Sequence, residues 1–340
     1  MKTAEDQTRK LNKDLENSLV IQKKAFSDLK DTKLQLAETE AAVRLTRVFE
    51  KFVPKEFLKR IAPDGLENLK FGQAESDFKT ILFSDIRDFT QLSESYSPQE
   101  LLDFLNNYLR MMNPAIMDHH GFVDKFIGDA IMAIFDRPDQ SDADEALDAV
   151  ASALSMLAVL DGINATLSAE EKARVDIGIG IHSGNVIIGT VGFEERMDST
   201  VLGDTVNLAS RLENLTKYYN CQLIISEATM ALIGTENRHQ IREIDLVSVK
   251  GRLEPLQIYE VFDADGHEQK QAKLQSRDDL GEAIRFYRES CWDDALERFE
   301  NCETIGPEDP LVQIYINRCR HNRIQPPGPD WNGVHAFDHK

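Results

Sequence analysis

Apolar residues recur at heptad spacing along residues 1–48 of this 340-residue chain, a stretch without proline or glycine. The two seam positions hold Leu15, Gln22, Leu29, Leu36 and Val43, and Leu19, Phe26, Lys33 and Glu40. This spacing predicts one long helix that pairs as a parallel coiled-coil dimer, in which polar seam residues lower stability and constrain register. A single solvated helix is the alternative, because Lys33 and Glu40 interrupt the seam.

A second pattern, in which strands and helices alternate, begins at residue 80. A serine, a proline and a glutamate within residues 97–100 mark a helix start with a capping box. The predicted elements are strands at 80–83, 200–202, 223–225, 241–249 and 256–262, hairpins at 121–135 and 175–192, and helices at 97–112, 144–160 and 205–217. Their order predicts an α+β fold, a ferredoxin-like βαββαβ sandwich with helices over one or both faces of the sheet.

The remaining segments flank this globular domain, which we assign to residues 76–265. Residues 49–75 are predicted to be a short linker or transducer segment, broken by Pro54. Residues 276–325 resemble a single tetratricopeptide-type helix pair, which cannot bury its own apolar face and must dock on the domain or a partner subunit. Residues 326–340 lack periodicity and are expected to form an irregular tail.

Composition then narrows the class of protein. A formal net charge of −20 argues against nucleic acid or an anionic membrane as a partner. Four cysteines without metal spacing indicate reduced thiols, and the charged amino terminus lacks the features of a signal peptide. The longest nearly uncharged apolar run, residues 149–160, is too short to span a bilayer. We therefore expect a cytoplasmic chain without a transmembrane segment.

Two acidic turns are candidates for a metal site. Asp85 follows the strand at residues 80–83, and Asp129 lies at the tip of the hairpin at residues 121–135. Paired carboxylates, with water and a backbone carbonyl that Ile86 could provide, are the usual ligands of Mg²⁺. Two unrelated loop aspartates are an equally valid interpretation of these residues alone.

The stretch T-V-L-G-D-T-V-N-L-A-S-R, residues 200–211, adds an amide and a guanidinium. Asn207 and Arg211 are four residues apart and therefore lie on one face of one helix. Together they suit an anionic group whose charge is stabilised in a transition state. Ordinary surface polarity could account for either residue alone, but poorly for the pair.

Five motifs in this order resemble the class III nucleotidyl cyclases. They are F-S-D-I-R-D-F-T, D-K-F-I-G-D-A-I-M-A-I-F, G-I-H-S-G-N-V-I-I-G, T-V-L-G-D-T-V-N-L-A-S-R and V-K-G, within residues 76–262. The resemblance implies in-line attack of a ribose 3′-hydroxyl on the α-phosphate, which releases pyrophosphate and closes a 3′,5′-cyclic nucleotide. It assigns Asp85 and Asp129 to two Mg²⁺ ions, which Mn²⁺ could replace, and assigns Asn207 to the ribose and Arg211 to the α-phosphate. Lys250 would contact the terminal phosphates.

The same resemblance bears on the choice of base. Members that use ATP place a lysine and an aspartate or threonine at two positions, where guanylate cyclases tend to place glutamate and cysteine. Lys125 and Thr200 occupy these positions here. Lysine can donate to adenine N1 and threonine can accept from the exocyclic amine, which favours an adenylate cyclase. A guanylate cyclase and a catalytically silent dimerisation module are the alternatives.

In the family, each site lies between two catalytic domains. The metal aspartates come from one chain, and Lys125, Thr200, Asn207 and Arg211 would come from the other. Because this chain carries both sets, the resemblance implies a head-to-tail homodimer with two equivalent sites. An upstream sensor domain or protein is an expected further partner.

Overall fold

The computed structural model describes residues 2–49, 60, 72, 74–137, 140–193, 196–235, 237–249, 254–328 and 331–337. The chain divides into two compact units, Met1–Lys59 and Arg60–Lys340, which we describe separately. The first contains α1 (Lys2–Phe49), a continuous helix of 48 residues, as the heptad pattern predicts. Seam residues such as Phe26 and Leu29 are exposed in the single chain. Pairing of this helix stays a prediction.

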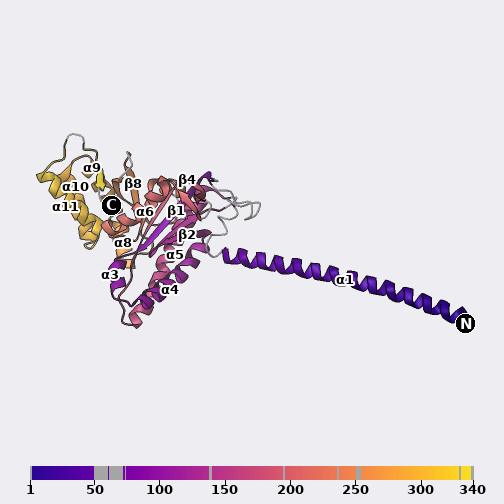
Figure 1. The fold of residues 1–340 in the computed structure, drawn as a ribbon. Helices are drawn as coiled ribbons and strands as arrows, with labels where there is room; N and C mark the ends of the chain where they lie inside the picture. The colour runs from indigo at the N-terminus through magenta and orange to yellow at the C-terminus, as the bar shows by residue number, and fades with distance from the viewer. Residues whose placement is uncertain are drawn as a thin grey trace. The chain divides into compact units, whose positions relative to one another are not determined.

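The second unit is built on one mixed sheet (Figure 1). Its strands are β1 (Ala74–Ile86), β2 (Gly121–Ile127), β3 (Ala130–Phe135), β4 (Ile177–Phe193), β5 (Arg196–Leu202), β6 (Leu223–Ser226), β7 (Ile241–Val249), β8 (Leu256–Val261) and β9 (His335–Phe337). Its helices are α3 (Phe89–Glu94), α4 (Pro98–Met117), α5 (Asp142–Ala169), α6 (Asp204–Tyr219), α7 (Glu227–Ile233), α8 (His267–Gln275), α9 (Arg277–Arg288), α10 (Trp292–Ile305) and α11 (Pro310–Ile324).

The strand order is β2-β3-β1-β4-β6-β8-β7-β9, with β5 paired to β4. β1 runs antiparallel to both β3 and β4, and β2 runs antiparallel to β3. The segment β1-α4-β2-β3-α5-β4 therefore forms the predicted βαββαβ core. Residues 49–75 of the predicted linker lie largely outside the described residues.

One predicted hairpin is wrong. The polar triplet Ser183-Gly184-Asn185 suggested a turn within residues 175–192, but β4 continues through it and pairs with β1 over the whole length of that strand. Ser183 is buried and its hydroxyl lies 2.8 Å from that of Thr80, so the triplet belongs to the interior of the sheet. The hairpin is instead made by β4 and β5. Long-range pairing with β1 overrides the local turn signal.

Alternating side chains send apolar groups to both faces of the sheet. Leu223 and Ile225 of β6 belong to a core with α4, α5 and α7, whereas Ile224 faces a second core with α6 and the C-terminal helices. The residues of α5 that pack into the first core include Ala149, Val150 and Ala153. Among the described helices, α5 alone is long and apolar enough to cross a membrane, and this packing makes it a core helix.

The C-terminal helices share the second core with the sheet and α6. α9 and α10 form the expected helix pair, and α11 adds a third helix to the same core. These three helices therefore dock on the sheet and α6 of the same chain. The tail expected to be irregular contains β9, which pairs in parallel with β7 and places Phe337 against Tyr218 and Tyr219. β9 is thus the edge strand beside β7.

Candidate active site

The β2–β3 hairpin presents Asp129 in a two-residue turn. β2 ends at Ile127 and β3 begins at Ala130, as the hairpin prediction requires. Gly128, the first turn residue, has a φ of 68°, in the left-handed region that glycine adopts without a steric penalty. The turn therefore fixes the Asp129 carboxylate relative to a paired sheet.

Asp85, near the end of β1, meets Asp129 across the sheet. The backbone N–H of Ile86 lies 3.1 Å from Oδ1 of Asp85 and 3.3 Å from Oδ2 of Asp129. Burial, together with a hydrogen bond and charge repulsion from Asp129, raises the pKa of Asp85 to about 7. The structure therefore brings together the two predicted metal-binding carboxylates.

This pair fits a divalent cation. Two adjacent carboxylates repel each other when both are ionised, and a cation between them removes that cost. Among the described residues, no group of three or more His, Cys, Asp or Glu side chains could hold a metal. A two-carboxylate set suits Mg²⁺, which keeps several waters and binds substrate phosphates. The contacts recorded at Ile86 involve its amide, and its carbonyl as a ligand stays a prediction.

A third carboxylate, which the sequence analysis missed, lies on α6. Burial and the charges of Asp85 and Asp129 raise the pKa of Glu213 to about 8, although Arg87 opposes this shift. Glu213 stands two residues after Arg211. Its sequence position looks like an ordinary charge on a helix, and only the packing of α6 on the sheet reveals its surroundings.

The backbone of α6 lies directly on β4. A Cβ atom at Gly180 would come within 2.2 Å of the Glu213 nitrogen and 2.5 Å of the Ala209 carbonyl oxygen, so only glycine permits this approach. Arg87 of the first motif donates to the carbonyl of Thr216 at 3.2 Å, near the end of α6. A cation there also interacts favourably with the helix dipole. Together these contacts fix α6 against β4 and the end of β1, the strand that carries Asp85.

The two residues predicted to recognise the base lie in direct contact. The Lys125 ammonium group, from β2, donates to the Thr200 hydroxyl, from β5, at 2.6 Å. Thr200 is buried, whereas 32% of the Lys125 side chain is exposed. Two residues 75 positions apart in the sequence thus form one polar group with an accessible cation.

Asn207 and Arg211 lie on the first two turns of α6. Asn207 is exposed and Arg211 is half-buried. Neither side chain has a partner among the described residues. Both are therefore available to an anionic ligand. Lys250, the predicted phosphate contact, lies outside the described residues.

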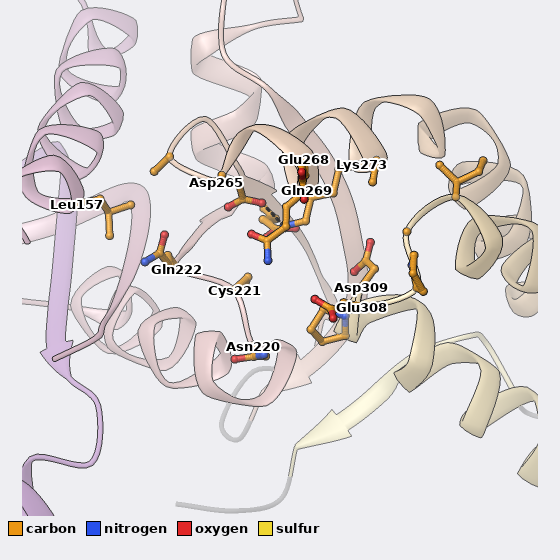
Figure 2. Close-up of a pocket in the computed structure, with 18 of the residues that line it drawn as sticks. Leu157, Asn220, Cys221, Gln222, Asp265, Glu268, Gln269, Lys273, Glu308 and Asp309 are labelled. Atoms are coloured by element: carbon orange, nitrogen blue, oxygen red, sulfur yellow. Dashed lines mark hydrogen bonds and ion pairs between the residues drawn. The ribbon is translucent and has the colours of Figure 1, made fainter. Parts of the chain in front are cut away.

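A pocket of about 890 Å³ lies apart from these residues, between α8, the start of β6 and the α10–α11 connection (Figure 2). Its lining includes none of the predicted site residues. Its buried charges pair with one another: Lys273 lies 2.8 Å from Glu260 and also pairs with Asp265. The predicted site residues that the structure describes thus come from the strands, the β2–β3 turn and α6, outside this pocket.

A ferredoxin-like sheet with paired strand-end carboxylates and an Asn–Arg helix defines a class III nucleotidyl cyclase domain. Residues 73–262 match the family described as the adenylate and guanylate cyclase catalytic domain, and the chain belongs to this family.

Two relatives named adenylate cyclases are similar to this chain. The chain is 43% identical over 279 residues to the terminal-differentiation-specific adenylate cyclase of Dictyostelium discoideum, which covers 82% of this chain and 13% of that protein. It is 47% identical over 218 residues to an adenylate cyclase of Anabaena cylindrica, which covers 63% of this chain and 42% of that protein. The chain thus spans less than half the length of either relative.

Solved structures confirm the fold. The adenylyl cyclase CyaB from P. aeruginosa superposes with a TM-score of 0.52 at 34% identity, covering 56% of this chain and 96% of that one. A bacterial light-regulated adenylyl cyclase superposes with a TM-score of 0.57 at 26% identity, covering 70% of this chain and 66% of that one.

Proposed function

We propose that this chain is an adenylate cyclase that converts ATP to 3′,5′-cyclic AMP and pyrophosphate. The ribose 3′-oxygen forms a bond to the α-phosphorus, and the bond from the α-phosphorus to the oxygen bridging to the β-phosphate breaks. The 3′-hydroxyl proton passes to solvent, and pyrophosphate leaves. The family membership and the two relatives named adenylate cyclases support this reaction.

Asp85 and Asp129 would hold two Mg²⁺ ions, or Mn²⁺ in their place, with the Ile86 carbonyl as a further ligand. When bound, the ions supply charge neutralisation on the triphosphate and favour ionisation of the 3′-hydroxyl. The raised pKa of Asp85 supports this assignment, because burial and the neighbouring Asp129 both disfavour the ionised carboxylate, and a bound cation would favour it.

The remaining polar groups position the nucleotide. Asn207 orients the ribose, and Arg211 stabilises the charge that develops on the α-phosphate. Their lack of described partners supports these roles, since a preorganised donor must be free for the transition state. Lys250 is assigned to the terminal phosphates on the resemblance alone.

The contact between Lys125 and Thr200 is the observation that carries the choice of ATP. Adenine offers an acceptor at N1 and a donor at its exocyclic amine, which match an ammonium donor and a hydroxyl acceptor. Guanine has a donor at N1, which would leave the Lys125 ammonium group mispaired, whereas the Thr200 hydroxyl can donate as well as accept and discriminates less. A guanylate cyclase is therefore disfavoured, and a silent module is disfavoured because the two aspartates, Asn207 and Arg211 are all present.

Each site is shared across a head-to-tail homodimer in this proposal. Large apolar side chains are exposed on the two hairpins: Phe126 and Ile127 on β2, and Val191 and Phe193 on β4. Such a concentration of exposed apolar groups is typical of an interaction surface. The exposed seam of α1 would pair in parallel and relay a signal from an upstream sensor domain or protein. We place the chain in the cytoplasm, where its nucleotide substrate is available.

Mixing two inactive variants tests the shared site. Asp85→Ala and Asn207→Ala should each lose cyclic AMP synthesis, whereas exchanged mixtures should recover activity because one site of the heterodimer is intact. Two Asp85→Ala preparations mixed together are the matched control. Heterodimers that form, as shown by differently tagged chains, but stay inactive would refute sharing.

The base assignment has its own test. The double variant Lys125→Glu with Thr200→Cys should shift activity from ATP toward GTP, measured as cyclic AMP and cyclic GMP with Mg²⁺ and with Mn²⁺. An undiminished preference for ATP would exclude this pair as the base-recognition group.

A further inference from the structure

A β-bulge places Asp124 next to the proposed base-recognition pair. β2 and β3 align Val123 with Ala133 and Lys125 with Met132, so Asp124 has no partner in the ladder. Successive residues of a regular strand point to opposite faces, whereas a bulge can turn two neighbours toward the same side. Here Oδ2 of Asp124 lies 3.4 Å from the ammonium nitrogen of Lys125.

The Asp124 carboxylate is almost completely buried. Its side chain is 1% exposed, and neither oxygen has a hydrogen-bond partner among the described residues. Burial raises the pKa of Asp124 to about 6, Lys125 opposes the rise, and Asp198 of β5 adds to it. A buried carboxylate is costly without a compensating cation. Lys125 is the described cation that forms an ion pair with it.

Lys125 therefore has two fixed neighbours at its ammonium group, the Thr200 hydroxyl and the Asp124 carboxylate. A lysine side chain has several rotatable bonds and loses considerable conformational entropy when it is held in one place. The two contacts restrict this freedom before substrate binds. Because Asp124 is buried and Lys125 is partly exposed, the lysine is positioned to meet the base and the aspartate to hold the lysine.

We infer that Asp124 is a positioning residue for base recognition: it holds the Lys125 ammonium group beside Thr200, so that the site accepts 6-aminopurine and rejects 6-oxopurine nucleotides. The inference rests on the proposed adenylate cyclase function. Without the carboxylate, the ammonium group would be free to reach the guanine O6 acceptor. Discrimination against GTP would then fall, together with affinity for ATP.

Asp124→Asn in the full chain tests this inference, because asparagine keeps the shape and removes the charge. We expect the ratio of kcat/KM for ATP to that for GTP to fall about tenfold, mainly through a higher KM for ATP. Asp124→Glu should restore most of the ratio. Asp198→Asn, which changes a neighbouring carboxylate that forms no described ion pair with Lys125, should leave the ratio within about twofold of the parent.

A double-mutant cycle separates this inference from the proposed function. If Asp124 acts through Lys125, then Asp124→Asn should have no further effect on the ratio in a Lys125→Ala background. If Lys125→Ala lowers the ratio of kcat/KM for ATP to that for GTP, but Asp124→Asn alone leaves it unchanged, the positioning role is overturned and the base assignment stands. A ratio that Lys125→Ala leaves unchanged would overturn both. Should Asp124→Asn not fold, Asp124→Ser takes its place, because it also removes the carboxylate. A ratio and a KM for ATP equal to those of the parent would then refute the role.

Discussion

The C-terminal helices hold α6 through a buried aspartate, and removing its charged partner should weaken both stability and activity. Asp245 of β7 is fully buried. It accepts hydrogen bonds from the hydroxyls of Tyr219, the last residue of α6, at 2.6 Å and Tyr315 of α11 at 3.0 Å. Arg318 of α11 completes the group with an ion pair of 2.5 Å. The perturbation we choose is Arg318→Met, which keeps the length of the apolar part of the side chain.

The expected size follows from this burial. Removing one member of a buried ion pair leaves an uncompensated charge and costs about 3–5 kcal/mol. The two tyrosine hydroxyls still contact Asp245, so we expect the lower end, about 3 kcal/mol. For a domain of this size each kcal/mol lowers Tm by roughly 2–4 °C, which gives a decrease of roughly 10 °C.

Arg320→Met provides a matched control on the same helix. Arg320 pairs with Glu300 at 3.5 Å, and both side chains are 55% exposed. Exposed pairs contribute about 0–1 kcal/mol, so this variant should melt close to the parent. Calorimetry or circular dichroism on the full chain, at one protein concentration, gives both values.

Activity provides a second readout, because Tyr219 ends the helix that carries Asn207 and Arg211. A small displacement of groups that position the reacting atoms lowers kcat strongly. We expect kcat of Arg318→Met to fall about tenfold at temperatures well below its Tm, with Arg320→Met unchanged. Equal Tm values for the two variants would refute the reasoning about the buried charge. A lower Tm with unchanged kcat would show that the anchor stabilises the fold without positioning α6.

Two further changes test the packing around the site, and a third tests the predicted pairing of α1. Gly180→Ala should destabilise the domain by about 1–3 kcal/mol and abolish cyclase activity, because its Cβ would overlap the α6 backbone. Gly162→Ala in α5 is the control: it has open space around it and should stabilise the domain slightly. Glu213→Gln should make the metal-free protein more stable than the parent. This difference in the free energy of unfolding should grow as pH rises from about 4.5 to 8, by at most ~1 kcal/mol per pH unit. The native pKa is raised, so the glutamate favours folding only while protonated; thermal melts of both proteins at pH 5 and pH 8 check the sign. Removing residues 1–48 should make activity depend steeply on protein concentration in a dilution series.

Local signals in the sequence were sufficient for much of the fold. The capping box at Ser97 and Glu100 forms as predicted. The Gly128-Asp129 turn and the strand predicted at residues 223–225 also lie where the pattern places them. In each of these cases the residues that carry the signal are close together in the chain. The ferredoxin-like topology followed from the order of such elements.

Predictions that depended on distant partners were less complete. The turn expected at Ser183-Gly184-Asn185 fails because these residues pair with β1, more than 90 positions earlier in the chain. Glu213 and Asp124 carry no local signal, because a charged residue on a helix or strand gives no indication of its burial. Pairing Lys125 with Thr200 required knowledge of the family, and the structure then placed the two side chains in contact.

The β2–β3 hairpin links the two halves of the proposed mechanism. It carries Asp129 at its turn and Lys125 four residues earlier. In the proposed homodimer, Asp129 serves the metal pair of one site and Lys125 reads the base in the other. A displacement of one hairpin that separates Asp129 from Asp85 would therefore also withdraw Lys125 from the second site. Because both groups stand on one paired sheet, a relative rotation of the two chains in the proposed homodimer would be sufficient to disable both sites together, and we therefore propose dimer geometry as the point of control.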